Sequence, residues 1–215
     1  MDSGDFASLL PLWIISIAGI WFSFPVCIYL FRPNAIRSYF KDNDYTRIME
    51  QKGVRDLIKK LKSLNFEYLG VKVEEPPLWK RSQEEVSLKS TEALAFASIG
   101  IKNRMIRFYF LTTFKEGKIV LTANSSFTEA DNDEIIQSSL DRDEPKEILE
   151  IHKKHVASFV NRGFTPCEEY TRQSRINAAN LYYNSRLSRR QLRTAGAINF
   201  AFFLVFCFFL ILPLF

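Results

Sequence analysis

Two uncharged apolar segments, one at each end of the chain, constrain its fold more than any other feature. Residues 9–31 and 195–215 contain no Asp, Glu, Lys or Arg. The hydrocarbon core of a bilayer is about 30 Å thick, and roughly 20 helical residues at about 1.5 Å each cross it. Soluble proteins rarely carry helices at both termini that are apolar on all sides. Both segments are therefore predicted to span a membrane, although 25% of all residues are charged.

The residues before the first span argue against a cleaved signal peptide. Residues 1–8 include Asp2 and Asp5 but neither Lys nor Arg. A secretory signal has a positively charged leader, a shorter apolar stretch and a cleavage site of small residues. We expect the first span to stay in the mature protein.

Positive charge is concentrated beside both spans, on the side of the central region. Residues 32–62 contain nine Lys or Arg against four acidic residues, and residues 172–193 contain six Arg and no acidic residue. Positively charged flanks stay on the cytoplasmic side of a membrane. The sequence thus predicts a two-pass protein of the inner (cytoplasmic) membrane, with residues 1–8 outside, spans at 9–31 and 195–215, and one cytoplasmic domain at 32–194.

The central region predicts an α+β domain with an antiparallel sheet of about four strands. Runs rich in aromatic and β-branched residues favour strands, and they occupy residues 66–73, 93–101, 104–114 and 118–123. Lys115-Glu116-Gly117 is typical of a hairpin turn that ends in a left-handed residue. The polar, acidic residues 124–143 are expected to form a loop.

Helices are expected before and after these strands in the chain. Residues 44–64 have an apolar stripe at helical spacing, with Asp44 as a possible cap. A second helix is predicted to begin at Pro145 and to end near Arg162, before Gly163, because Pro favours the first turn and Gly follows the last. Residues 170–193 lack Gly and Pro, which predicts a helix that can continue into the second span.

The only two histidines, His152 and His155, lie three residues apart in the second predicted helix. Two imidazoles at this spacing share a helix face and can bind one metal ion, or one of them can act as a base. No segment rich in Cys or His completes a ligand set, and Cys27, Cys167 and Cys207 have no paired spacing. The pattern is more typical of two histidines at the boundary of a core than of a metal site.

Motifs for the common catalytic and cofactor sites are not found. The chain has neither a G-x-S-x-G nucleophile motif nor a glycine-rich phosphate loop. The acidic run 129–134 lacks the central Gly and closing Glu of a calcium loop. We therefore expect neither a cofactor nor a resident metal.

Arginines beside the spans predict contact with anionic lipid head groups. Arg186, Arg189, Arg190 and Arg193 share one helix face next to the second span, and Arg32 and Arg37 follow the first span. Basic residues near a membrane surface contribute about 1 kcal/mol each to such binding, although fixing the topology also explains them. Residues 63–171 contain 14 basic and 18 acidic residues, so nucleic acid is not an expected partner.

Small residues in the spans predict close helix contacts. Gly19 and Ser23 are four residues apart, as are Ala197 and Ala201, and this spacing lets helices approach each other. Neither span contains the acidic or basic side chains that ion or proton pathways use.

Two functions remain open from the sequence. The first is a non-enzymatic accessory, scaffold or assembly subunit of a larger membrane complex, with integral membrane proteins as partners and the cytoplasmic domain as the docking part. The second is a membrane-bound enzyme or regulator that acts on a lipid or lipid-linked substrate through His152 or His155.

Overall fold

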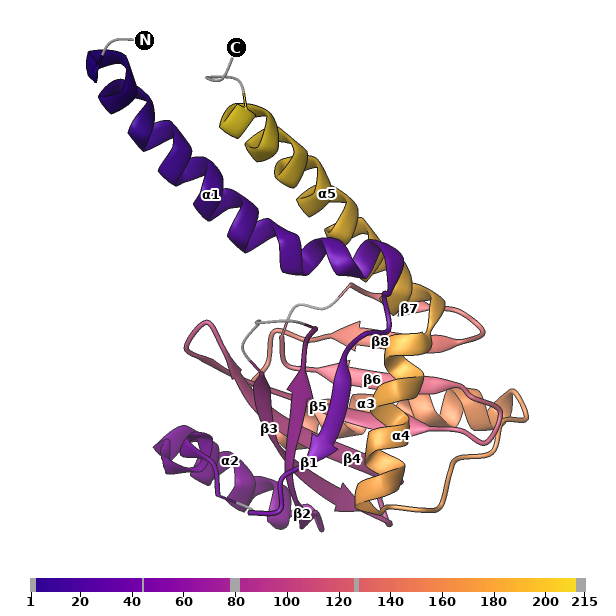
Figure 1. Ribbon diagram of the computed structural model, residues 1–215. Helices are drawn as coiled ribbons and strands as arrows, with labels where there is room; N and C mark the ends of the chain where they lie inside the picture. The colour runs from indigo at the N-terminus through magenta and orange to yellow at the C-terminus, as the bar shows by residue number, and fades with distance from the viewer. Residues whose placement is uncertain (1–2, 44, 78–81, 126–127, 212–215) are drawn as a thin grey trace. The chain divides into compact units, whose positions relative to one another are not determined.

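The chain divides into two units in the structure, a computed structural model that describes residues 3–43, 45–77, 82–125 and 128–211 (Figure 1). The first unit consists of Met1–Ile36, Pro76–Arg81 and Arg186–Phe215. The second consists of Arg37–Glu75 and Ser82–Ser185.

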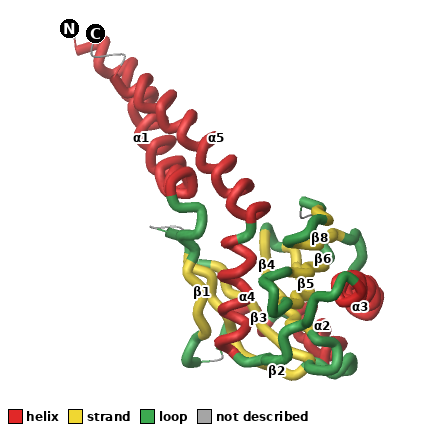
Figure 2. The backbone as a smooth tube through the Cα atoms, turned by 90° about the vertical axis from the view of Figure 1, so that its right-hand side faces the viewer, coloured by secondary structure: helices red, strands yellow, loops and turns green. Residues whose placement is uncertain are grey.

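The first unit contains two long apolar helices that pack against each other. Helix α1 spans Ser3–Phe31 and helix α5 spans Arg186–Ile211, and they lie side by side (Figures 1 and 2). Residues Leu10–Phe31 and Arg186–Ile211 are long and apolar enough to cross a membrane. Helix α5 begins before residue 195, because the arginine-rich segment continues the helix. Residues 212–215 of the expected second span lie outside the described residues.

The second unit is built on an eight-stranded sheet with the order β1-β2-β3-β4-β5-β6-β8-β7. Neighbouring strands are antiparallel except β6 and β8, which are parallel. The strands are β1 Arg37–Phe40, β2 Glu67–Glu75, β3 Gln83–Ser90, β4 Ala95–Lys102, β5 Met105–Thr113, β6 Ile119–Ala123, β7 Ala130–Asp131 and β8 Ile135–Ser139.

The two faces of the sheet have different chemistry. On one face, apolar side chains pack against α2 (Lys52–Lys62) and α3 (Pro145–Asn161) and form the main core. Val86, Ile99 and Phe108 are successive cross-strand neighbours in this core. Helix α4 (Arg172–Asn184) lies on the other face (Figure 2). Because side chains alternate along a strand, the residues between the apolar ones point toward α4.

The α+β class is confirmed, but the sheet is twice as large as expected and mixed. The four predicted strands correspond to β2, β4, β5 and β6. Strands β1 and β3 are polar at alternate positions, so their sequences do not show the apolar run of a strand. Strands β7 and β8 lie in residues 124–143, which were expected to be a loop. The prediction of an entirely antiparallel sheet is wrong at β8. The chain crosses over through β7 after β6, and β8 then pairs with β6 in parallel.

The predicted helices are present but are interrupted. The helix expected at 44–64 is a 3-10 turn, Arg47–Glu50, followed by α2, because Gln51 is extended between them. The expected cap, Asp44, lies outside the described residues, and the Thr46 side chain accepts a hydrogen bond from the Ile48 N–H instead. The helix expected at 170–193 is divided between α4 and α5, because Ser185 is extended with ψ 150°.

Candidate functional site

A cluster of four charged side chains lies between α4 and the sheet. Lys72 and Glu74 belong to β2, Glu85 belongs to β3, and Arg175 is in the first turn of α4. Lys72 and Glu74 share a face because they are two residues apart, and Lys72 pairs with Glu85 across the strands. Lys72 is 0% exposed and Arg175 is 1% exposed. Two positive and two negative charges therefore balance in a nearly closed site.

Ion pairs and hydrogen bonds connect the members of this buried charge cluster. Lys72 Nζ donates to the Glu74 carboxylate and lies 2.9 Å from Glu85 Oε2. Arg175 Nη2 lies 3.7 Å from Glu85 Oε2 and donates to the Tyr109 hydroxyl at 2.6 Å. The Tyr109 hydroxyl donates in turn to Glu85 Oε2 at 2.7 Å. The network thus links α4 to three strands of the sheet.

Electrostatic coupling keeps Lys72 and Glu74 charged at neutral pH. Burial and Arg175 act to lower the pKa of Lys72, but Glu74 and Glu85 outweigh them and raise it above its usual value. Burial acts to raise the pKa of Glu74, but Lys72 and the hydrogen bond from Tyr183 hold it below its usual value. Groups with these shifts do not exchange protons near pH 7. The cluster is suited to holding α4 in place rather than to acid–base chemistry.

His152 belongs to α3, which packs on the face of the sheet opposite to α4, and both of its ring nitrogens form hydrogen bonds. Thr112 Oγ1 donates to the Leu94 carbonyl at 2.6 Å, so it accepts from His152 Nε2–H at 2.9 Å. His152 Nδ1 then accepts from the Thr122 hydroxyl at 3.1 Å. This pattern assigns the neutral Nε2–H tautomer. With both nitrogens occupied and the side chain 0% exposed, His152 is poorly placed to act as a base or a metal ligand.

His155 lies at the edge of the same region. Its Nδ1 is 3.3 Å from Ser138 Oγ, and the Ser138 hydroxyl is 3.4 Å from Thr122 Oγ1. The two histidines therefore contact different hydroxyls of one hydrogen-bonded chain. Across the residues that the structure describes, no group of three or more His, Cys, Asp or Glu is arranged to hold a metal ion.

Burial of the histidines predicts a loss of stability in mild acid. Burial lowers the pKa of His152 from 6.5 to about 3, and burial also lowers the pKa of His155. Below pH 6.5 the unfolded chain binds a proton that folded His152 does not bind, so the free energy of unfolding falls as the pH falls. One proton difference corresponds to a slope of about 1.36 kcal/mol per pH unit.

This slope is measurable by urea unfolding of the full chain in detergent at pH 6.5 to 5.5, a window that stays about one pH unit above 4.5, the ordinary pKa at which Glu74 titrates in the unfolded chain. We expect His152→Gln to flatten the slope more than His155→Gln does, because His152 is the more deeply buried. Equal slopes for the wild type and His152→Gln would contradict the assignment of His152 as a buried neutral group.

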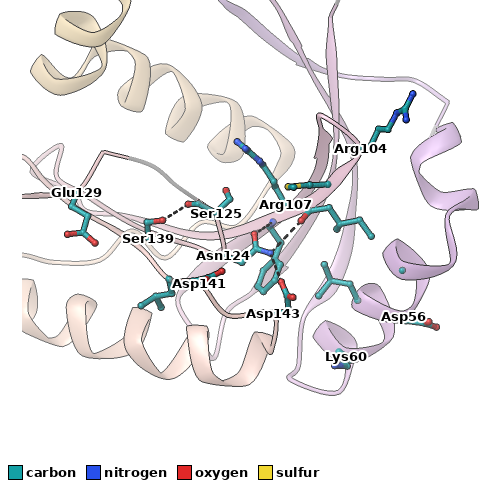
Figure 3. A pocket seen from close by; sticks show the side chains of 16 residues that line it. Asp56, Lys60, Arg104, Arg107, Asn124, Ser125, Glu129, Ser139, Asp141 and Asp143 are labelled. Atoms are coloured by element: carbon teal, nitrogen blue, oxygen red, sulfur yellow. Dashed lines mark hydrogen bonds between the residues drawn. The ribbon is translucent and has the colours of Figure 1, made fainter.

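A cleft of about 1010 Å³ opens where β6 ends (Figure 3). Helix α2 contributes Gly53, Asp56, Leu57 and Lys60 to its lining. Arg104, in the turn before β5, and Met105–Phe108 of β5 line it as well. The end of β8 and the segments after β6 and β8 contribute the rest, among them Ser139, Asn124 and Asp143. The cleft lies beside the first residues of β5, which extend past Ala123, the last residue of β6.

The cleft presents charges of both signs beside an apolar floor. Its basic side chains are Lys60, Arg104 and Arg107, and its acidic side chains are Asp56, Glu129, Asp141 and Asp143. In Figure 3, Asp56 and Lys60 lie at the opposite end of the cleft from Glu129 and Ser139. Lys60 donates to Glu144 at 2.7 Å, so its charge is already paired at the rim. The lining described by the structure includes neither His nor Cys.

The arginines beside the spans are exposed in the structure. Arg32 follows α1, while Arg186, Arg189, Arg190 and Arg193 form the first two turns of α5. Arg37 belongs to β1, in the second unit, where it pairs with Glu75 in the sheet. Contact of these side chains with lipid head groups stays a prediction.

Two glycines lie where α1 and α5 approach each other closely. A Cβ atom at Gly19 would lie 2.5 Å from the Phe206 ring, and one at Gly196 would lie 2.5 Å from the Leu30 backbone nitrogen. Ser23 is buried and its hydroxyl donates to the Gly19 carbonyl at 2.6 Å. Ala197 and Ala201 are exposed. Helix packing through these two alanines stays a prediction.

Comparisons with protein-family models, with curated proteins and with solved structures find no match to this chain. The sequence and the geometry above are therefore the basis for any functional conclusion.

The sequence did not identify the buried charge cluster or the cleft. One signal of the cluster is visible in Lys72 and Glu74, which alternate with the apolar Val71 and Val73. Such alternation defines one polar face of a strand, but that face is normally exposed to solvent. The cleft leaves no signal of this kind, because it depends on where two distant strands end.

Proposed function

We propose that this chain is a two-pass membrane protein that acts as a non-enzymatic accessory or scaffold subunit of a larger membrane complex. Its second unit, called the sheet domain below, is the docking part of the proposal. The observation that carries this proposal is the cleft beside β6. It combines apolar and charged side chains without a histidine or cysteine among the described residues. A cleft that combines an apolar lining with a few polar groups is typical of a binding site.

The membrane part of the proposal is supported by the surface of α1 and α5. Phe22 is 76% exposed and Phe208 is 59% exposed. Large apolar side chains left exposed on a helix pair suit contact with lipid chains. The arginines beside the spans support an orientation with the sheet domain in the cytoplasm. A reporter fused to the C-terminus tests this orientation, and cytoplasmic activity of the reporter would contradict it.

The alternative of a histidine-based enzyme for lipid substrates has less support. His152 is buried with both ring nitrogens bonded to hydroxyls. A general base needs a nitrogen that reaches the substrate proton. The His155 ring is more accessible, but its Nδ1 lies beside Ser138 rather than in the cleft.

Purification of the full chain from its native membranes in a mild detergent tests the proposed function. We expect the chain to migrate in native gels as a complex much larger than its 25.0 kDa with a bound micelle, and to retain the same partner proteins at a fixed ratio after a second affinity step. The untagged chain from the same membranes is the control. A monodisperse monomer without stoichiometric partners would refute the proposal.

A further inference from the structure

Four exposed arginines lie at one end of the helix pair α1 and α5. At this end a Cβ atom on Gly196 of α5 would lie 2.5 Å from the backbone nitrogen of Leu30 in α1. Arg193 precedes Gly196 by three residues and Arg32 follows Leu30 by two, so both arginines lie within about 5 Å of this contact along the helix axes. The next turn of α5 carries two more. The four residues, called the arginine collar below, are Arg32, Arg189, Arg190 and Arg193.

The length of α5 places the collar at the boundary of a bilayer. Helix α5 spans Arg186–Ile211, and its residues 194–211 carry no charge. At about 1.5 Å per residue this apolar part is about 27 Å long, close to the roughly 30 Å of a hydrocarbon core. Arg193 is then the first charged residue outside the core. Arg190 and Arg189 lie about 6–8 Å further out, at the depth of the lipid head groups.

The first unit provides no negative charge near the collar. Its only acidic residues are Asp2, which precedes α1, and Asp5, at the start of α1. Asp5 and Arg32 are 27 residues apart, which corresponds to about 40 Å of helix. Among the residues that the structure describes, no collar arginine takes part in an ion pair. By contrast, the exposed Arg142 of the second unit pairs with Glu147 at 2.6 Å.

The stability of α5 does not explain the collar. Arg189 and Arg193 are four residues apart, and like charges at this spacing on a helix repel each other. Positive side chains in the first turns also oppose the helix macrodipole, which favours negative charge at the N-terminus. Both effects destabilise the helix that carries the collar. Anions bound from outside the chain would offset both.

The collar consists of arginine alone, although the chain contains 15 Arg and 14 Lys. Either residue fixes the orientation of a span, and the two have similar helix propensities. Topology and helix formation therefore do not select arginine. A guanidinium group can donate two parallel hydrogen bonds to one phosphate, whereas an ammonium group acts as a point charge. The composition of the collar thus favours phosphate as its ligand.

Apolar side chains next to the collar favour a lipid as the source of this phosphate. Ile198, about one turn beyond Arg193 in the apolar part of α5, is 53% exposed, and Phe31, beside Arg32, is 75% exposed. A phospholipid places its phosphate at the depth of the collar and its acyl chains against these side chains. Free phosphate or an acidic protein surface would leave them uncovered.

We propose that the arginine collar binds anionic phospholipids through paired hydrogen bonds from its guanidinium groups to the lipid phosphates. The inference rests on the membrane part of the proposed function, and it adds a lipid partner to the proposed protein partners. It assigns the collar a ligand in addition to its effect on topology.

Native mass spectrometry of the full chain tests this inference, with the chain in detergent micelles that contain equal amounts of phosphatidylglycerol and phosphatidylcholine. We expect the chain to retain phosphatidylglycerol in preference. Each basic residue near a membrane surface contributes about a fivefold gain in affinity for anionic lipid. The combined change to Gln at all four collar positions should therefore lower the affinity for phosphatidylglycerol more than about a hundredfold. A micelle has no inside or outside, so an effect on topology does not contribute.

Two further variants are matched controls. Lys at all four collar positions retains the charge but loses the paired hydrogen bonds, so it should bind phosphatidylglycerol several-fold more weakly than the wild type. It also keeps the test decisive if the Gln variant does not fold. Gln at four exposed basic residues of the second unit changes the net charge by the same amount and should leave binding unchanged. These four residues are Arg55, Lys59, Lys62 and Arg104.

Several outcomes would overturn the inference. They are equal retention of the two lipids by the wild type, wild-type binding by the Gln or Lys collar variant, and weaker binding by the control in the second unit. Displacement of phosphatidylglycerol by excess inorganic phosphate would identify free phosphate as the ligand instead. A protein that copurifies with the wild type and is lost from the Gln collar variant, without retained lipid, would make the collar a protein-docking surface.

Failure of this inference can be distinguished from failure of the proposed function. If the chain retains stoichiometric protein partners from native membranes but shows no lipid preference, the proposed function stands and the inference fails. If the lipid preference is found and no protein partner is retained, the inference stands and the proposed function fails. If the chain is absent from the membrane fraction, both are refuted.

Discussion

Lys72→Met is expected to lower the free energy of unfolding of the sheet domain by about 3–5 kcal/mol, the usual cost of leaving a buried charge without its partner. The ammonium group lies within ion-pair distance of both Glu74 and Glu85 and is 0% exposed. Without it, two carboxylates face each other under α4, with Arg175 as their one remaining counter-charge in the cluster. Since domains are stable by about 5–15 kcal/mol in total, the loss is a large part of the stability.

Thermal unfolding of the full chain in detergent, followed by circular dichroism, measures this effect as a fall in Tm of roughly 10 °C, at about 2–4 °C per kcal/mol. The double variant Lys72→Met/Glu74→Gln should recover part of the loss, because it leaves Arg175 and Glu85 as a balanced pair. Lys60→Met is the matched control: its partner Glu144 lies at 2.7 Å, but both side chains are about half exposed, so the cost is at most about 1 kcal/mol. Equal shifts for Lys72→Met and Lys60→Met would contradict the role assigned to the buried cluster.

Elements with local signals were predictable from the sequence. Helix α3 was expected from Pro145 to about Arg162 and is found at Pro145–Asn161, because its capping residues and its apolar stripe lie within one short segment. The hairpin between β5 and β6 was also predictable, since Gly117 adopts the left-handed conformation, with φ 76°, that the turn requires. In both cases the residues that determine the structure are close in sequence.

Elements that depend on distant partners were missed. Strand β3 contains Gln83, Glu84, Glu85 and Lys89, and only the arrival of α4 turns its polar face into a buried one. Strand β8 gains its stability from parallel pairing with β6, and parallel pairing leaves no turn signal between the two strands. The residues 124–143 are acidic on average, which concealed the apolar Ile135 and Ile136 of β8.

The two candidate sites also depend on residues that are distant in sequence, so they were predictable only in part. Lys72 and Glu74 could be placed on one face of a strand from their spacing, but their partners Glu85 and Arg175 are distant in sequence and are brought to them by the fold. The cleft depends on a difference in strand length: β5 begins at Met105, while β6 ends opposite Tyr109. Sequence patterns predict where a strand forms, but they do not predict how the ends of two neighbouring strands align in the sheet.

Gly196→Leu is expected to separate α1 from α5. A Cβ at this position would lie 2.5 Å from the backbone nitrogen of Leu30 and 3.1 Å from its Cα, and backbone atoms cannot move aside as a flexible side chain can. Helices that approach through small residues must move apart when a large side chain is introduced. The increase should be about 2 Å, the spread of interaxial distances that contact side chains produce.

Spin labels on Phe22→Cys and Phe202→Cys, in a chain with Cys27, Cys167 and Cys207 replaced by Ala, measure this distance by pulsed electron paramagnetic resonance in lipid nanodiscs. Both labelled positions are exposed. We expect a longer and broader distance distribution for Gly196→Leu and an unchanged one for Ala197→Leu, because Ala197 is the adjacent residue but is exposed. An unchanged distribution for Gly196→Leu would show that the two helices do not meet at this glycine. A change for Ala197→Leu would instead place the alanine face, predicted from the sequence, in the contact.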